Sequence, residues 1–143
     1  MKIGTNASVI RLSEQDDALE YCYQQGWTDG LPVVPPTPER VQAVLDTVRR
    51  KPTEVLGAFM PVGAEITVEK VAINAVLAGC LPEYFPTVLT AVECMADQEG
   101  SMGGLLTTIH GDTPLIVING PIIQSLGFNA GVNTFGPGWR ANA

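Results

Sequence analysis

Residues 61–95 read PVGAEITVEKVAINAVLAGCLPEYFPTVLTAVECM, and this stretch decides the fold. It predicts two helices that meet at a turn around Gly79, the second beginning at Pro82 or Pro86. Thr67 is the expected N-cap of the first helix. Apolar side chains recur at helical spacing on both sides of that helix, which is typical of a buried element. They belong to Val68, Val71, Ala72, Ile73, Ala75, Val76 and Leu77.

The composition indicates one folded domain over residues 1–143. Of its side chains, 45% are hydrophobic and 16% are charged, so burial can offset the loss of chain entropy. A surface with so few charges and so much apolar content also predicts that a second chain covers part of it.

The charge balance argues against nucleic acid, because a net charge of -7 and eight Lys and Arg residues cannot neutralise a phosphate backbone. The one basic run, residues 49–51, is interpreted as complementing a helix dipole. There is no apolar run of ~20 residues and no signal architecture. Three cysteines without paired spacing predict free thiols. We therefore expect a soluble cytoplasmic protein with no membrane partner.

Two further helices are predicted before the central pair. The first covers residues 14–25, with Ser13 and Asp16 as a capping-box-like start. The second begins after Thr37, has an apolar stripe on one side, and ends by Pro52.

The predicted strands are short. Residues 32–36 are rich in proline and predict an edge segment or a polyproline-like strap. Residues 56–62 predict a strand and residues 63–66 a loop. Residues 105–110 and 115–119 predict two more strands, and the second is almost entirely apolar, as in a strand buried on both faces. The expected fold is a layered α/β domain with a short, partly parallel sheet and a buried central helix pair.

The C-terminal part of the sequence is unusual. After a short predicted helix, glycines recur among Asn and Phe residues, as in a loop whose backbone lies close to a ligand or a partner. Candidate substrate-binding residues are Asn119, Asn133, Gly136 and Gly138. The sequence ends on this loop, so we expect a partner chain to complete the fold.

Three segments carry a resemblance to a known family. They are GWTDGLPVVPPTPERV at 26–41, VGAEITVEKVAINAVLAGCLPEYFPTVL at 62–89 and FGPGWRANA at 135–143. Together they resemble a mostly uncharacterised bacterial family linked to the UGSC-type thiol and selenoprotein group. The sequence contains no Cys-Gly-Ser-Cys, which counts against a redox role.

The resemblance implies that relatives continue beyond the position of Ala143. On that interpretation the chain is an N-terminal portion, either a split subunit or the product of cleavage after Ala143. Autocatalytic cleavage would leave an N-terminal nucleophile on the partner chain.

Three side chains of the central stretch are candidate catalytic groups. Glu65 and Glu69 lie a helical turn apart, where burial raises and a helix N-terminus lowers a carboxyl pKa. The alternative role is simple stabilisation of the helix dipole. Cys80 lies before the second helix, whose N-terminus favours a thiolate, although a small buried residue in a tight turn is the slightly favoured interpretation. Glu69 and Cys80 are separated by roughly 16 Å of helix, so they cannot share one small site.

His110 is the only histidine and follows a predicted strand, where it is a candidate proton carrier or an ordinary loop residue. No spacing matches a metal motif, and the glycine-rich residues 100–104 lack the lysine of a phosphate loop. We therefore expect no metal and no cofactor.

Three functions remain open. The first is an enzyme subunit of hydrolase or lyase type, acting on a small polar substrate at a site shared with a second polypeptide in a hetero-oligomer. The second is a noncatalytic structural or binding subunit. The third is thiol-dependent redox chemistry at Cys80.

Overall fold

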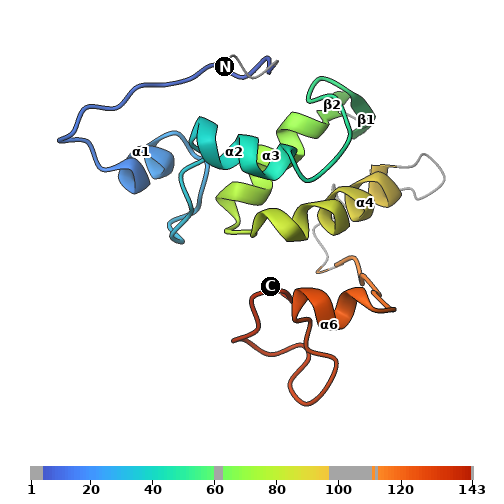
Figure 1. The fold of residues 1–143 in the computed structure, drawn as a ribbon. Helices are drawn as coiled ribbons and strands as arrows, with labels where there is room; N and C mark the ends of the chain where they lie inside the picture. Colours follow the sequence, from blue (N-terminus) through green and yellow to red (C-terminus); the bar gives the residue numbers. More distant parts are fainter. Residues whose placement is uncertain (1–4, 60–62, 97–110, 112, 143) are drawn as a thin grey trace.

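The computed structural model describes residues 5–59, 63–96, 111 and 113–142, and it shows a mixed α/β chain (Figure 1). Its helices and strands are α1 (Ala18–Gln24), α2 (Pro38–Leu45), β1 (Val55–Phe59), β2 (Ala64–Thr67), α3 (Val68–Leu77), the 3₁₀ turn η1 (Pro82–Tyr84), α4 (Phe85–Ala96) and α6 (Ile122–Leu126). None of the described helices is long and apolar enough to span a membrane.

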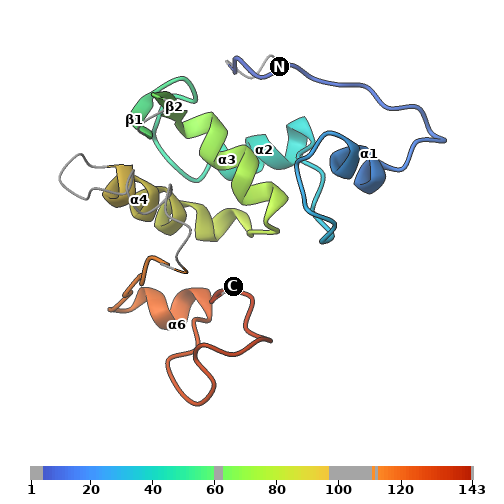
Figure 2. The same ribbon diagram turned by 180° about the vertical axis from the view of Figure 1, so that it is seen from behind.

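Helix α3 forms the centre of the core, which confirms the predicted buried helix after Thr67. Both α2 and α4 pack against it (Figures 1 and 2). Phe85, at the start of α4, is fully buried, and withdrawing such a side chain from water stabilises a fold by about 1.5–3 kcal/mol. The core cluster consists of Val41, Val44, Leu45, Ile66, Val68, Val71, Ala72, Ala75, Val76, Phe85 and Leu89.

Both ends of α3 are capped. At the N-terminus Thr67 accepts a hydrogen bond from the Lys70 N–H, and the first two N–H groups donate to main-chain carbonyls of the loop before β1. At the C-terminus Gly79 has a φ of 81°. Its N–H donates to the Val76 carbonyl, and the Cys80 N–H donates to the Ala75 carbonyl, both at 2.9 Å. These two hydrogen bonds make a Schellman motif. The predicted cap and stop are therefore confirmed.

Helix α1 starts later than its predicted range of 14–25. Asp17 is the N-cap, and its Oδ1 accepts the Leu19 N–H at 2.8 Å. The Ser13 hydroxyl and N–H both donate to Asp16 instead, which closes a separate turn. Two neighbouring aspartates competed for the cap, and the one whose carboxylate reaches the helical N–H groups takes it.

Helix α2 begins after Thr37 as predicted, but it ends well before Pro52. The proline-rich residues 32–36 form an extended strap without regular secondary structure. The Val34 N–H donates to the Leu77 carbonyl at 3.1 Å, so the strap is tied to the C-terminus of α3.

The sheet differs from the prediction. Among the described residues it is a two-stranded antiparallel hairpin of β1 and β2, and the predicted partly parallel sheet is not seen there. Residues 63–66, predicted as a loop, mostly belong to β2. Glu65 and Ile66 alternate between solvent and core there, but a pattern of four residues is too short to distinguish a strand from a loop.

Residues 115–119 were predicted to form a buried strand, and this is wrong. They are irregular, and Leu115 and Val117 are 73% and 76% exposed. An apolar run becomes a strand only where a neighbouring strand accepts its hydrogen bonds, and no described residue supplies one. The predicted strand at 105–110 lies outside the described residues, whereas the short helix after Pro121 is confirmed as α6.

The basic residues 49–51 do not complement a helix dipole, because α2 ends at Leu45 and carries no basic residue in its last turn. Arg50 instead forms ion pairs with Glu54 at 2.8 Å and with Glu93 of α4 at 2.7 Å.

Candidate functional site

The first described residues, 5–12, form an extended segment that we call the N-terminal arm. It is held by Glu69, whose carboxylate accepts the main-chain N–H groups of Asn6 and Ala7, both at 2.9 Å. Glu69 is only 4% exposed, and hydrogen bonds to an ionised carboxylate are stronger than neutral ones. The buried charge is thus satisfied by a segment more than sixty residues away in sequence.

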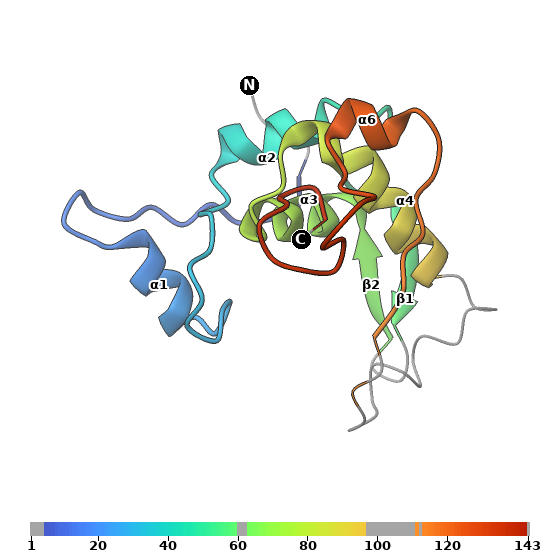
Figure 3. The same cartoon turned by 90° about the horizontal axis from the view of Figure 1, so that it is seen from below.

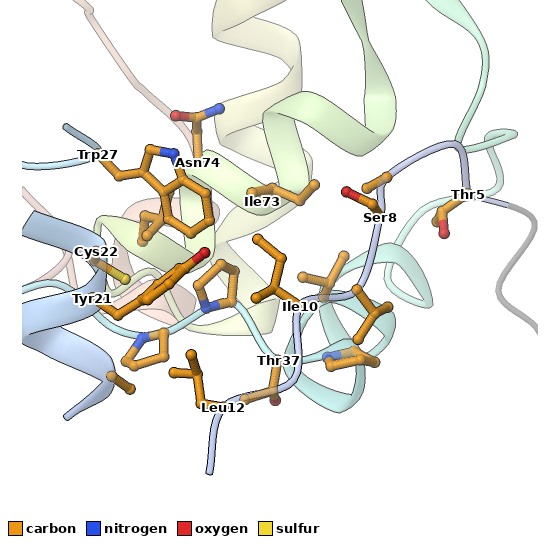
Figure 4. Close-up of a pocket in the computed structure, with 18 of the residues that line it drawn as sticks. Thr5, Ser8, Ile10, Leu12, Tyr21, Cys22, Trp27, Thr37, Ile73 and Asn74 are labelled. Carbon is orange, nitrogen blue, oxygen red and sulfur yellow. The ribbon is translucent and has the colours of Figure 1, made fainter. Parts of the chain in front are cut away.

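A cavity of about 840 Å³ lies between the N-terminal arm and helices α1, α2 and α3. Its walls are mostly apolar. In Figure 4, Ile10 points from the arm toward Ile73 of α3, with Tyr21 and Trp27 on the facing side.

The aromatic wall follows from how α1 ends. Gly26 has a φ of 70°, and the Trp27 N–H bonds to the Cys22 carbonyl at 3.0 Å, so the chain reverses in a second Schellman motif. This reversal brings Trp27 back against Tyr21. The two ring centroids are 6.0 Å apart and the rings are nearly perpendicular, at 79°.

The cavity has little polar chemistry. Of the described residues that line it, Glu69 alone carries a charge at neutral pH, and Thr5, Ser8, Thr37 and Asn74 contribute neutral polar groups. Lysine, arginine and histidine are missing from its described walls. The arrangement suits binding of an apolar molecule better than proton transfer, which needs a partner for the carboxylate.

The predicted catalytic residues are not gathered around this cavity. Glu65 lies exposed on β2 and does not line it, and its main-chain carbonyl accepts the Lys70 ammonium at 2.7 Å. Cys80 follows the other end of α3, so the predicted separation from Glu69 holds. His110 lies outside the described residues.

Cys80 is half-buried near Arg140, which belongs to residues 127–142, the segment after α6 that we call the C-terminal tail. Burial raises the pKa of its thiol, and the nearby Arg140 guanidinium partly opposes that shift. Arg140 donates to the Gly79 carbonyl at 2.8 Å, which joins the tail to the C-terminus of α3. Figure 3 shows the tail looped beneath that helix.

The four predicted substrate-binding residues lie in residues 113–142, which we call the C-terminal segment, and none of them lines the cavity. Asn119 is exposed in the irregular stretch before α6. Asn133 adopts a φ of 64°, and its main-chain carbonyl accepts the Gly136 N–H at 3.0 Å. A side chain at Gly136 would collide with Asn133. Gly138 also has a left-handed conformation, so these residues shape the backbone of the tail.

The N-terminal arm and its cavity were missed in the sequence. From the sequence, Glu69 was interpreted only as a catalytic group or as a carboxylate that stabilises the helix dipole. Nothing in the local pattern identified the distant segment whose main-chain N–H groups it accepts.

Within the residues that the structure describes, no three His, Cys, Asp or Glu side chains gather in a way that could hold a metal ion. No protein-family model, curated protein or solved structure matches this chain.

Proposed function

We propose that this chain is a structural and binding subunit of a larger assembly, in which a second polypeptide covers its C-terminal segment. The observation that carries the proposal is the exposure of large apolar side chains in that segment.

The exposed apolar side chains of the C-terminal segment support this proposal. Val132 and Phe135 are 94% and 92% exposed, and the apolar residues 115–117, which precede α6, are exposed as well. Exposed apolar side chains that recur along one segment are costly in water and typical of protein interfaces. The asparagines of the tail hold its backbone in place: Asn142 accepts the Asn129 N–H at 2.8 Å and donates to the Asn129 carbonyl at 3.0 Å.

The hydrolase or lyase function stays a prediction for the assembled protein. It would need a carboxylate free to exchange a proton with substrate. Glu69 is engaged with two N–H groups, and the cavity that it lines is largely apolar rather than suited to a small polar substrate. These contacts favour the binding subunit over the catalytic one.

The test compares two variants of the tagged chain expressed in its own organism. Val132→Ser/Phe135→Ser removes apolar surface from the tail, and Leu31→Ser removes an exposed leucine from the turn before the proline-rich strap. We expect native mass spectrometry to find the unmodified chain and Leu31→Ser in a complex of fixed stoichiometry with a second polypeptide. The double variant should lose that complex.

Unfolding curves of all three proteins show whether any loss of the complex reflects misfolding. If the unmodified chain stays monomeric, or if Val132→Ser/Phe135→Ser assembles normally, the proposal is contradicted.

A further inference from the structure

We propose that the cavity beneath the N-terminal arm is a binding site for a mainly apolar organic cation. The inference stands apart from the covering of the C-terminal segment, because it concerns the opposite end of the chain. Three observations lead to it: the size of the cavity, its aromatic wall and the sign of its one charge.

The size and composition of the cavity are those of a small-molecule site. Its volume of about 840 Å³ falls within the range of roughly 300–1,000 Å³ that is usual for ligand pockets. Helices α1, α2 and α3 contribute part of its wall, and the N-terminal arm and the proline-rich strap contribute most of the rest. Apolar side chains such as Ile10 and Ile73 reach into it from opposite sides (Figure 4).

The charge of the walls selects against anions. The single charged side chain among the described lining residues is the Glu69 carboxylate, and the chain as a whole has a net charge of -7. An acidic ligand would lose its hydration and meet no positive partner, which costs several kcal/mol for a buried charge. The site therefore accepts neutral or positively charged molecules.

Two groups favour a positive charge. The Glu69 carboxylate has about four acceptor positions, of which the Asn6 and Ala7 N–H groups occupy two, so it can still attract a cation. The nearly perpendicular rings of Tyr21 and Trp27 form a corner of the same cavity. Aromatic faces attract organic cations by about 0.5–2 kcal/mol, more where water is excluded.

The N-terminal arm completes the site. Glu69 holds it through two hydrogen bonds to main-chain N–H groups, and it contains no helix or strand. The carboxylate that would attract the cation is therefore the same one that positions this wall of the cavity.

The experiment uses two probes of the same shape and opposite charge, tetraphenylphosphonium and tetraphenylborate. Isothermal titration calorimetry with the full chain measures both affinities. Quenching of Trp27 fluorescence in a Trp139→Phe background reports where the probe binds, because Trp139 lies in the tail outside the cavity. We expect saturable 1:1 binding of the phosphonium, tighter than that of the borate by at least about tenfold.

Variants separate the site from the general negative field of the protein. Glu69→Gln should weaken phosphonium binding by about fivefold or more. Glu20→Gln makes the same change in charge at an exposed position of α1 that does not line the cavity, and it should leave the affinity unchanged. Equal affinity for the two probes, or equal losses in the two variants, would overturn the proposal.

A second variant covers the case in which Glu69→Gln releases the arm and disturbs the fold. Ile73→Trp places a larger side chain in the cavity without changing the charge. It should abolish phosphonium binding measured by calorimetry while far-ultraviolet circular dichroism stays that of the unmodified chain. If the filled variant binds phosphonium normally, the cavity is not the site.

Discussion

At the scale of single residues, Glu69 and Cys80 show how the two ends of one helix acquire different chemistry. Glu69 lies in the first turn of α3, where its carboxylate accepts two main-chain N–H groups of the N-terminal arm. Cys80 lies just past the C-terminus, where the helix dipole and burial both oppose a thiolate. The positive charge of Arg140 partly compensates for this.

Burial raises the pKa of the Cys80 thiol, which leads to a prediction about alkylation. Only the thiolate reacts with iodoacetamide, so Cys80 should react more slowly at pH 8 than the exposed Cys94, by about fivefold or more. Peptide mass spectrometry over time measures both rates. In denaturant the two rates should converge, and the buried Cys22 should join them. A native Cys80 that reacts as fast as Cys94 would instead support the thiol-dependent function.

The roles of residues that act on their own neighbours could be predicted from the sequence. Thr67 and Gly79 shape the backbone within a few positions of themselves, so their local pattern was sufficient. The role of Glu69 could be predicted only in part, because its partners lie more than sixty residues away. For the same reason the contact of Arg140 with Gly79 could not be foreseen.

At the scale of elements, the helices were easier to predict than the strands. A helix satisfies its own hydrogen bonds, so periodicity and caps define α2, α3 and α4 locally. A strand depends on its neighbour, which is why β2 was predicted as a loop and residues 115–119 as a strand.

The packing of the hairpin on α4 can be tested at Gly57. A Cβ atom there would lie 2.9 Å from the Ala96 Cβ and 3.0 Å from its carbonyl oxygen. Because both neighbours are close to the main chain, they cannot move aside cheaply. We expect Gly57→Ala to lower the free energy of unfolding by about 1–3 kcal/mol in urea titrations.

Gly111→Ala is the matched control, since a Cβ atom at that position meets nothing within 4 Å. It should change the free energy of unfolding by no more than about 0.5 kcal/mol. Equal effects of the two substitutions would mean that β1 and α4 do not approach each other as described.

At the scale of the whole molecule, the arm, the strap and the tail all return to α3. The arm bonds to Glu69 at its N-terminus, while the strap and the tail bond to Leu77 and Gly79 at or just past its C-terminus. The position of α3 at the centre of the fold could therefore be predicted from its own apolar pattern. The segments that gather around it carry no regular pattern, so their positions could not be derived from the sequence.

Arg50 adds a long-range ion pair to this arrangement, because it bonds both to Glu54 before β1 and to Glu93 on α4. Its hydrogen bond and charge lower the pKa of Glu54 below the ordinary value of 4.5. A carboxyl group whose pKa is lowered by folding stabilises the folded state above that ordinary value. This stabilisation is lost as the pH falls below 4.5 and through the lowered pKa that Glu54 has in the folded protein.

The pH dependence of the Arg50 pairs can be isolated by comparing the unmodified chain with Arg50→Met. Acid also reduces the repulsion that accompanies a net charge of -7, so the stability of one protein alone would mix two opposing effects. The difference between the two proteins removes most of that shared contribution. We expect the unmodified chain to have the higher urea midpoint at pH 7 and the two midpoints to approach each other below pH 4.5. A difference that stays constant down to pH 3 would show that Arg50 stabilises the fold through packing of its aliphatic stem.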